Sequence, residues 1–91
     1  MKFEWDENKR LINLQRHGID FADVDLVFEN ETTTTVDERF DYGEIRYLTY
    51  GLLRGEIVTI VHNEIDEIIR IISFRKATRY EQREYFQKIR N

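Results

Sequence analysis

The positive charge of this chain is concentrated in one stretch near its end, IIRIISFRKATRYEQREYF, at residues 68–86. The stretch contains five basic side chains: Arg70, Arg75, Lys76, Arg79 and Arg83. A guanidinium presents its donors in a fixed fork that matches a phosphate group. Arginines held on a rigid element are therefore candidates for binding a phosphate.

Two of these arginines lie inside a predicted strand that is otherwise apolar, EIIRIISF and the residue after it. Because a strand points alternate side chains to opposite faces, Arg70 is expected to share a face with Ile72. Arg75 is expected on the other face with Ser73. Only one of the two arginines then points into a shared cleft, unless a β-bulge intervenes. Arg75, at the end of the strand, is expected to be the more accessible.

Two interpretations of these strand arginines stay open, because an unpaired buried charge is costly. One is a structural ion pair, for which the sequence offers the carboxylates of Glu44, Asp41 and Asp6. The other is a guanidinium held on the sheet for a phosphate, with Arg46 on a neighbouring strand beside it.

The other basic residues of the stretch, Lys76, Arg79 and Arg83, lie on or next to a predicted helix at about residues 79–89. Tyr80 and Tyr85 share that helix, and aromatic rings beside arginines can stack on unpaired bases. The alternatives are a solvated helix face for the arginines and simple packing for Tyr85.

No other catalytic signature is present in the sequence. There is no glycine-rich phosphate loop, no H-E-x-x-H motif, no nucleophile elbow and no cysteine. His17 is expected at a helix end, and His62 at a strand end, exposed or hydrogen-bonded. The two are far apart in the sequence, so we expect neither a metal site nor a cofactor.

The predicted elements give an α+β fold. A short strand or arm at residues 2–5 precedes two helices; Asp6 caps the first, Gly18 ends it, and Asp20 begins the second. An antiparallel sheet of about four strands follows, at residues 32–40, 45–53, 56–61 and 67–74, with turns at 41–44, 54–55 and 63–66. Thr78 and Glu81 match a capping box for the C-terminal helix.

The chain of 91 residues is expected to form a single domain, residues 1–91. Residues 70–91 hold seven basic and two acidic residues, a balance of +5, whereas the whole chain has a net charge of −4. Such asymmetry often marks a surface for a polyanion or a partner protein. No signal peptide or membrane-spanning stretch is recognisable, so a cytoplasmic location is expected.

Three motifs in this order resemble the BrnT family of bacterial type II toxin–antitoxin toxins. The first is an F-x-W-D-x-x-K-x-x-x-N-x-x-x-H-G-I-x-F run: Phe3, Trp5, Asp6, Lys9, Asn13, His17, Gly18, Ile19 and Phe21. The second supplies Gly43, Glu44, Arg46 and Gly51, and the third Arg70, Ile72, Ser73, Arg75, Ala77, Glu81 and Tyr85.

The resemblance implies a RelE-like fold and a ribonuclease that cleaves RNA and halts translation. It also implies a ribbon-helix-helix antitoxin of BrnA type, which would form a hetero-oligomer with the toxin and bind operator DNA for the pair. Cleavage without a metal needs a base, an acid and cations for the phosphorane. The candidates for charge stabilisation are Arg46, Arg70 and Arg75. The candidates for proton transfer are Glu44, Lys9, His17 and Tyr85, and the candidates for RNA binding are Lys76, Arg79 and Arg83.

An alternative stays open beside the active ribonuclease. Members of the family tend to carry a basic residue in the turn before the last strand, where this chain has Glu64-Ile65-Asp66-Glu67. They commonly read S-A-R where this chain has Phe74 between Ser73 and Arg75. These differences are compatible with a weakened or inactive toxin that acts only as a binding module in an antitoxin complex.

Overall fold

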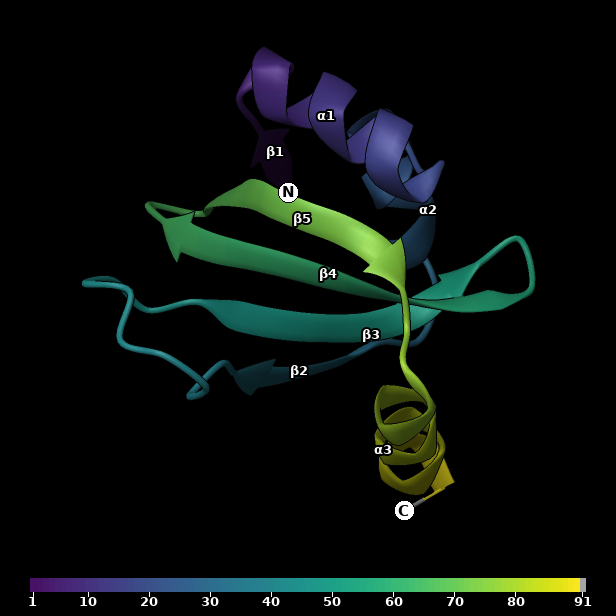
Figure 1. Cartoon of the computed structure of the whole chain (residues 1–91). Helices are drawn as coiled ribbons and strands as arrows, with labels where there is room; N and C mark the ends of the chain where they lie inside the picture. The colour runs from purple at the N-terminus through teal and green to yellow at the C-terminus, as the bar shows by residue number, and fades with distance from the viewer. Residues whose placement is uncertain (91) are drawn as a thin grey trace.

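The computed structural model describes residues 1–90 of the chain and has an α+β fold. In chain order the elements are β1 (Lys2–Glu4), α1 (Glu7–His17), the 3₁₀ turn η1 (Phe21–Asp23), α2 (Val24–Phe28), β2 (Thr33–Val36), β3 (Tyr47–Leu53), β4 (Glu56–Ile65), β5 (Ile68–Lys76) and α3 (Arg79–Arg90). The sheet lies between two helical layers, with α1 and α2 on one side and α3 on the other (Figure 1). The predicted α+β class is confirmed.

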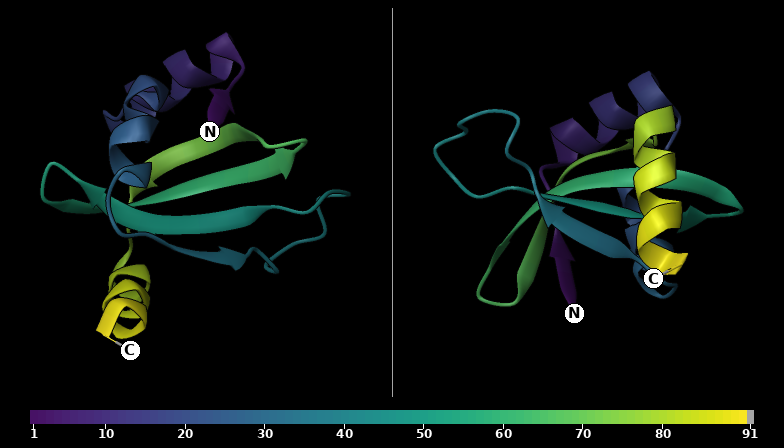
Figure 2. Two further views of the ribbon diagram at one scale, coloured as in Figure 1. Left: turned by 180° about the vertical axis from the view of Figure 1, so that it is seen from behind. Right: turned by 90° about the horizontal axis from the view of Figure 1, so that it is seen from below.

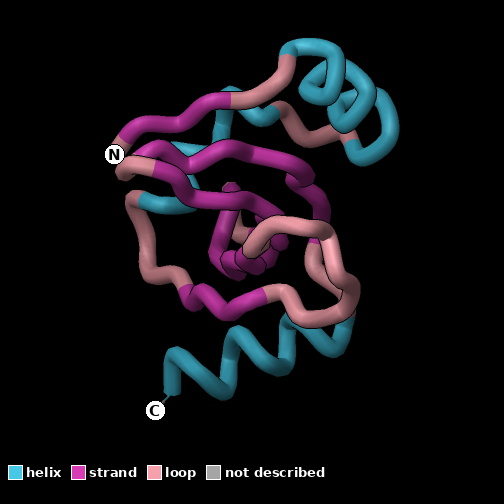
Figure 3. Tube along the Cα trace, turned by 90° about the vertical axis from the view of Figure 1, so that its left-hand side faces the viewer, coloured by secondary structure: helices cyan, strands magenta, loops and turns pink. Residues whose placement is uncertain are grey.

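The sheet has five strands in the order β1-β5-β4-β3-β2. β1 runs parallel to β5 and pairs Glu4 with Arg70, whereas all other neighbours are antiparallel. The four predicted strands are antiparallel to one another, but the sheet is mixed and not purely antiparallel, because the predicted N-terminal strand joins it as a fifth strand in the parallel sense. Both faces of the sheet are covered, as the side view in Figure 3 shows.

Each face of the sheet has its own apolar core. On the α1–α2 face, Phe21, Val24, Val27, Ile60 and Phe74 are almost fully buried together with five further residues. Gly51 lets α2 pack closely on β3, because a Cβ there would lie 2.6 Å from Val27 Cγ1. The α3 face has a smaller core of four buried side chains: Leu48, Tyr50, Val61 and Tyr85.

A β-bulge in β5 changes which side chains share a face. Val61 pairs with Ser73 but its neighbour His62 pairs with Ile71, so Ile72 is the extra residue. Ile71 and Phe74 consequently both enter the α1–α2 core. Arg70 and Arg75 therefore lie on one face, the α3 face, and the prediction from simple alternation that they lie on opposite faces is wrong.

The turns follow the sequence in two of three places. Arg54 and Gly55 have φ of 49° and 83° and join β3 to β4, as the two-residue hairpin predicts. Gly43 has a φ of 73° in the predicted turn at 41–44. The turn predicted at 63–66 is wrong, because β4 continues to Ile65 and the chain reverses at Asp66 and Glu67, whose φ angles are 52° and 67°.

The threonine-rich strand is shorter than predicted and ends at Val36. Asp37 then leaves the strand, and its N–H donates to Arg46 O at 2.8 Å. Residues 37–46 form a long excursion beyond the sheet, seen as the thin teal segment in the two views of Figure 2. This excursion carries two of the predicted site residues, Glu44 and Arg46.

Asn13 fixes α1 against the edge of β5 where β1 no longer covers it. Its side-chain amide accepts from Phe74 N at 3.2 Å and donates to Phe74 O at 2.8 Å, as a neighbouring strand would. It also donates to Ile19 O at 3.1 Å.

The predicted ends of α1 are confirmed: Asp6 accepts from Lys9 N, and Gly18 has a left-handed φ of 71°. Within residues 1–90, no helix is long and apolar enough to cross a membrane.

Candidate active site

A row of polar side chains crosses three adjacent strands on the α3 face. Tyr50 of β3 pairs with Thr59 of β4, which pairs with Arg75 of β5. Because neighbouring strands lie about 4.8 Å apart, the backbones of Tyr50 and Arg75 are roughly 10 Å apart. Two long side chains at that separation can reach one ligand group above Thr59.

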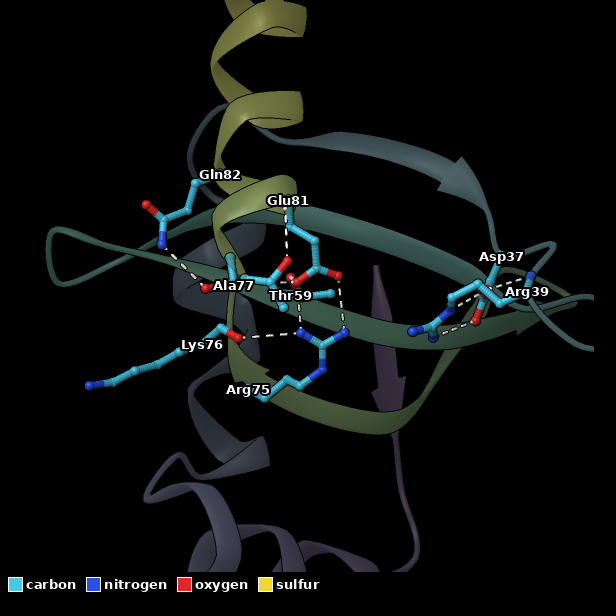
Figure 4. Close-up of polar contacts among 9 residues, drawn as sticks. Asp37, Arg39, Thr59, Arg75, Lys76, Ala77, Glu81 and Gln82 are labelled. Atoms are coloured by element: carbon cyan, nitrogen blue, oxygen red, sulfur yellow. Dashed lines mark hydrogen bonds and ion pairs between the residues drawn. The ribbon is translucent and has the colours of Figure 1, made fainter.

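The first turn of α3 binds this row through Glu81. Arg75 donates from Nη1 and Nη2 to the two carboxylate oxygens of Glu81 at 2.7 and 3.0 Å. Glu81 also accepts from Thr59 Oγ1 at 3.0 Å and from Thr78 N at 2.9 Å, and Glu81 N donates to Thr78 Oγ1 (Figure 4). The predicted capping box is therefore confirmed, and its carboxylate is also the partner of a site arginine.

Glu81 is a buried anion with a full set of donors. Burial by itself raises the pKa of Glu81, but the hydrogen bonds from Arg75 and Thr78 outweigh it and leave the pKa below the ordinary value. Because its four donors favour the ionised carboxylate, Glu81 is suited to orienting Arg75 and not to accepting a substrate proton.

Arg75 keeps one edge of its guanidinium unused. Its Nη1 donates to Glu81 and to Lys76 O, and its Nη2 gives one hydrogen to Glu81. Within residues 1–90, its Nε–H and the second Nη2–H have no partner. These two donors lie on the same edge of the guanidinium, which is the arrangement that binds a phosphate in a bidentate manner. The Arg75 side chain is 20% exposed, so a ligand can reach that edge.

The row opens onto a cleft of about 570 Å³ between α3 and the segment that follows β2. Asp37 and Arg39 line the cleft opposite Arg75, and Tyr50 and Glu84 also line it. In Figure 4 the Arg39 guanidinium extends from its own loop toward Arg75. Two arginines from opposite sides thus border one cavity.

Asp37 holds Arg39 in place. Its carboxylate accepts from Arg39 Nε and Nη2, both at 2.8 Å, from Arg39 N at 3.2 Å and from Tyr42 Oη at 3.1 Å. The bonds from Arg39 lower the pKa of Asp37 to about 2. Asp37 raises the pKa of Arg39 in return, and Nη1 of Arg39 has no partner within the described chain.

The scan against protein families matches residues 5–81 to a family described as "Ribonuclease toxin, BrnT, of type II toxin-antitoxin system". The match covers well over half of the chain. The chain belongs to the BrnT family. A search of curated proteins found no match. Arg39, Arg75 and Glu81 lie within the matched residues, and most of α3 lies beyond them.

Membership in this family places the chain among the ribonuclease toxins of type II toxin–antitoxin systems, in which the toxin has an antitoxin as its partner. No three His, Asp or Glu side chains among residues 1–90 converge as a metal-binding group.

Three of the predicted BrnT site residues gather away from the cleft, on the same face of the sheet. Glu44 accepts from Arg46 Nε at 3.1 Å and from Asn63 Nδ2 at 3.2 Å. Arg46 stacks on Tyr42, with Cζ 3.9 Å from the ring centre. Asn63 pairs with Arg70 across the two strands. Glu44, Arg46 and Arg70 therefore border one polar patch, which lies on the α3 face but at the end of the sheet away from α3.

Arg70 pairs with Glu4 of β1 at 3.1 Å and is 43% exposed. None of the three carboxylates offered by the sequence is the partner of either strand arginine. Asp6 caps α1, Asp41 accepts from Gly43 N, and Glu44 pairs with Arg46. Exposed pairs such as Arg70–Glu4 contribute little stability, so Arg70 remains available to a charged ligand.

Lys9 and His17 lie on α1, outside the cleft, and line a small hollow with Ser73 at the edge of β5. Burial, Arg16 and Arg75 lower the pKa of His17, so His17 is near enough to feel the Arg75 charge.

Tyr85 is 2% exposed and donates to Glu31 O at 3.0 Å, so it packs α3 against the sheet and cannot meet a substrate as the structure stands. Its prediction as a proton-transfer residue has no geometric support.

The predicted RNA-binding residues lie outside the cleft. Arg79 and Arg83 line a shallow exposed hollow with Phe86, and Lys76 pairs with Glu56 at 3.4 Å.

His62 is completely buried within β4, not exposed at a strand end. Its Nε2 hydrogen-bonds Thr49 Oγ1 at 2.7 Å, which confirms the hydrogen-bonded alternative. Burial lowers its pKa to about 4, so the 3.7 Å contact with Glu64 is not an ion pair at neutral pH. His62 is a core residue on the face opposite the cleft.

Proposed function

We propose that this chain is a toxin endoribonuclease that cleaves RNA without a metal ion by attack of a ribose 2′-hydroxyl on the adjacent phosphate. The observation that carries the proposal is the Arg75 guanidinium, oriented by Glu81 and open to the cleft along its Nε–Nη2 edge. Membership in a family of ribonuclease toxins supports the reaction class.

The geometry suits a transition state with extra negative charge. The phosphorane carries more charge on its non-bridging oxygens than the ground state, so a donor pair fixed in advance stabilises the transition state more. Glu81 supplies the fixed orientation of Arg75, and Asp37 does the same for Arg39 on the other side of the cleft. Arg39 then binds a neighbouring phosphate of the same strand.

In the cell, this activity would halt translation by cutting RNA, in the cytoplasm. The partner would be a ribbon-helix-helix antitoxin of BrnA type, which neutralises the toxin and binds operator DNA for the pair. Family membership supports an antitoxin partner, and the resemblance of the three motifs supports this antitoxin class and a RelE-like fold.

Induction of the chain alone in cells, followed by growth and RNA integrity, tests the proposal. Arrested growth with fragmented RNA is expected. Arg75→Lys should relieve both effects by at least tenfold, since lysine keeps a charge for Glu81 but lacks the Nε–Nη2 edge. Arg54→Ala, which removes an exposed arginine of the β3–β4 turn, is the matched control and should stay toxic.

Normal growth with intact RNA at high expression would contradict the proposal. If the chain then still co-purified with a ribbon-helix-helix protein encoded beside it, the chain would be a binding module without nuclease activity.

A further inference from the structure

Tyr50 presents a hydroxyl that no protein group satisfies. The residue is 5% exposed and belongs to the apolar core under α3, yet it lines the cleft. Within residues 1–90 its Oη makes no hydrogen bond, whereas the hydroxyls of Tyr42 and Tyr85 donate to Asp37 and to Glu31 O. Tyr50 Oη is not among the fully buried polar atoms that lack a partner, and Tyr50 lines the cleft, so the hydroxyl is open to a ligand from the cleft side.

Charged groups that line the cleft act on this hydroxyl. Burial raises the pKa of Tyr50, the charges of Glu81 and Glu84 raise it further, and Arg75 lowers it. The result lies above the ordinary value of 10, so the hydroxyl keeps its proton at neutral pH. A tyrosine in this state can donate a proton but cannot accept one.

Among the carboxylates that line the cleft, Glu84 is the best suited to act as the general base. Asp37 and Glu81 are each engaged by an arginine, and Glu38 is exposed. Glu84 is half-buried on α3, lines the same cleft and has no partner within the described chain. It lies close enough to Tyr50 for its charge to act on the hydroxyl.

We propose that Tyr50 is the general acid of this RNA cleavage and protonates the 5′-oxygen that leaves the scissile phosphate. The inference rests on the proposed function. Tyr50 and Arg75 belong to one row across three strands, so a phosphate on the free edge of Arg75 lies within reach of the Tyr50 hydroxyl.

The step conserves atoms and charge. The 2′-oxygen bonds to phosphorus while its proton passes to the Glu84 carboxylate. The bond from phosphorus to the 5′-oxygen breaks, its electron pair stays on that oxygen, and the Tyr50 proton neutralises it. The products are a 2′,3′-cyclic phosphate and a 5′-hydroxyl, and the Tyr50 phenolate recovers a proton from Glu84 directly or through water.

Tyr50→Phe tests this role, because it removes only the hydroxyl and keeps the ring in the core. Cleavage is measured on an RNA oligonucleotide and on the same oligonucleotide with sulfur in place of the 5′-oxygen at the cleaved linkage. A thiolate leaves without being protonated, since thiols have a pKa of about 8.5. Tyr47→Phe, on the other face of β3, is the matched control.

We expect Tyr50→Phe to slow cleavage of the oxygen substrate by about 10²- to 10⁴-fold and to cleave the sulfur substrate at nearly the wild-type rate. A loss below about tenfold on the oxygen substrate, or an equal loss on both substrates, would overturn the inference. Failure of the wild-type chain to cleave either substrate would instead contradict the proposed function.

Discussion

Arg75 and Glu81 stand six residues apart and join the end of β5 to the first turn of α3 through a bidentate ion pair. Glu81 is also the capping-box residue of that helix. The carboxylate that begins α3 therefore also orients the arginine assigned to the phosphate. Formation of the helix and assembly of the proposed site depend on the same side chain.

Removing the Glu81 charge should destabilise the protein. Glu81→Gln leaves Arg75 without its ionic partner in a mostly buried position, at a cost of about 3 kcal/mol in the free energy of unfolding. Urea denaturation measures it. Glu84→Gln, one turn further along the same helix, should change that free energy by less than about 0.5 kcal/mol. Equal effects of the two variants would show that the pair contributes no particular stability.

Replacement of both partners separates stability from activity. Arg75→Met combined with Glu81→Gln should recover most of the stability lost in Glu81→Gln alone, because it removes the unpaired buried charge and glutamine keeps the capping box. The double variant should fold and leave RNA intact. RNA cleavage at the wild-type rate by this variant would rule out Arg75 as the phosphate ligand.

Arg39 should contribute to RNA binding through one phosphate. Arg39→Ala is expected to weaken binding of a single-stranded oligonucleotide and to reduce the slope of log affinity against log salt by about 0.7. Titrations at several salt concentrations give this slope. Arg54→Ala, in the exposed β3–β4 turn, should leave the slope unchanged; a change of the same size there would mean that only net charge matters.

Asn13 should hold α1 on the sheet. Asn13→Ala removes three hydrogen bonds and leaves the backbone N–H and C=O of Phe74 without partners at the edge of β5. We expect this loss to cost about 2 kcal/mol in the free energy of unfolding. Thermal unfolding is the measurement. Gln15→Ala, an exposed position on the same helix, should leave the midpoint nearly unchanged, and a matching shift there would contradict the role of Asn13.

His62 should make stability depend on pH. Its pKa is about 4 in the folded chain and 6.5 when unfolded, so the unfolded state binds more protons between these values. The stability due to neutral His62 is complete above pH 6.5 and is lost as the pH falls toward 4, by on the order of 3 kcal/mol. Urea midpoints at several pH values measure the loss. His62→Gln should flatten this part of the profile, and an unchanged slope would assign it to other groups.

The sequence predicts local features of this chain well. The capping box of Thr78 and Glu81, the Gly18 helix end and the Arg54-Gly55 hairpin were all predictable, because each depends on residues close together in the chain. Family membership was predictable too, since the BrnT motif residues are spread along the chain in a fixed order.

Relationships set by the tertiary structure were not predictable in the same way. The bulge at Ile72, which brings Arg70 and Arg75 to one face, has no signal in an unbroken apolar strand. The cleft combines Arg39 with Tyr50, and the sequence predicts both only as members of separate strands. The partnership of Arg75 with Glu81 needs the reversal between β5 and α3, which only the folded chain shows.

The most direct test of the proposed chemistry is cleavage of an RNA that carries a single 2′-deoxy nucleotide on the 5′ side of the scissile phosphate, in the presence of EDTA. The 2′-hydroxyl is the proposed nucleophile, so the unmodified RNA should be cut to a 2′,3′-cyclic phosphate and the deoxy-substituted RNA should remain intact at that linkage. Continued cleavage at the deoxy position, or loss of all cleavage in EDTA, would contradict the account.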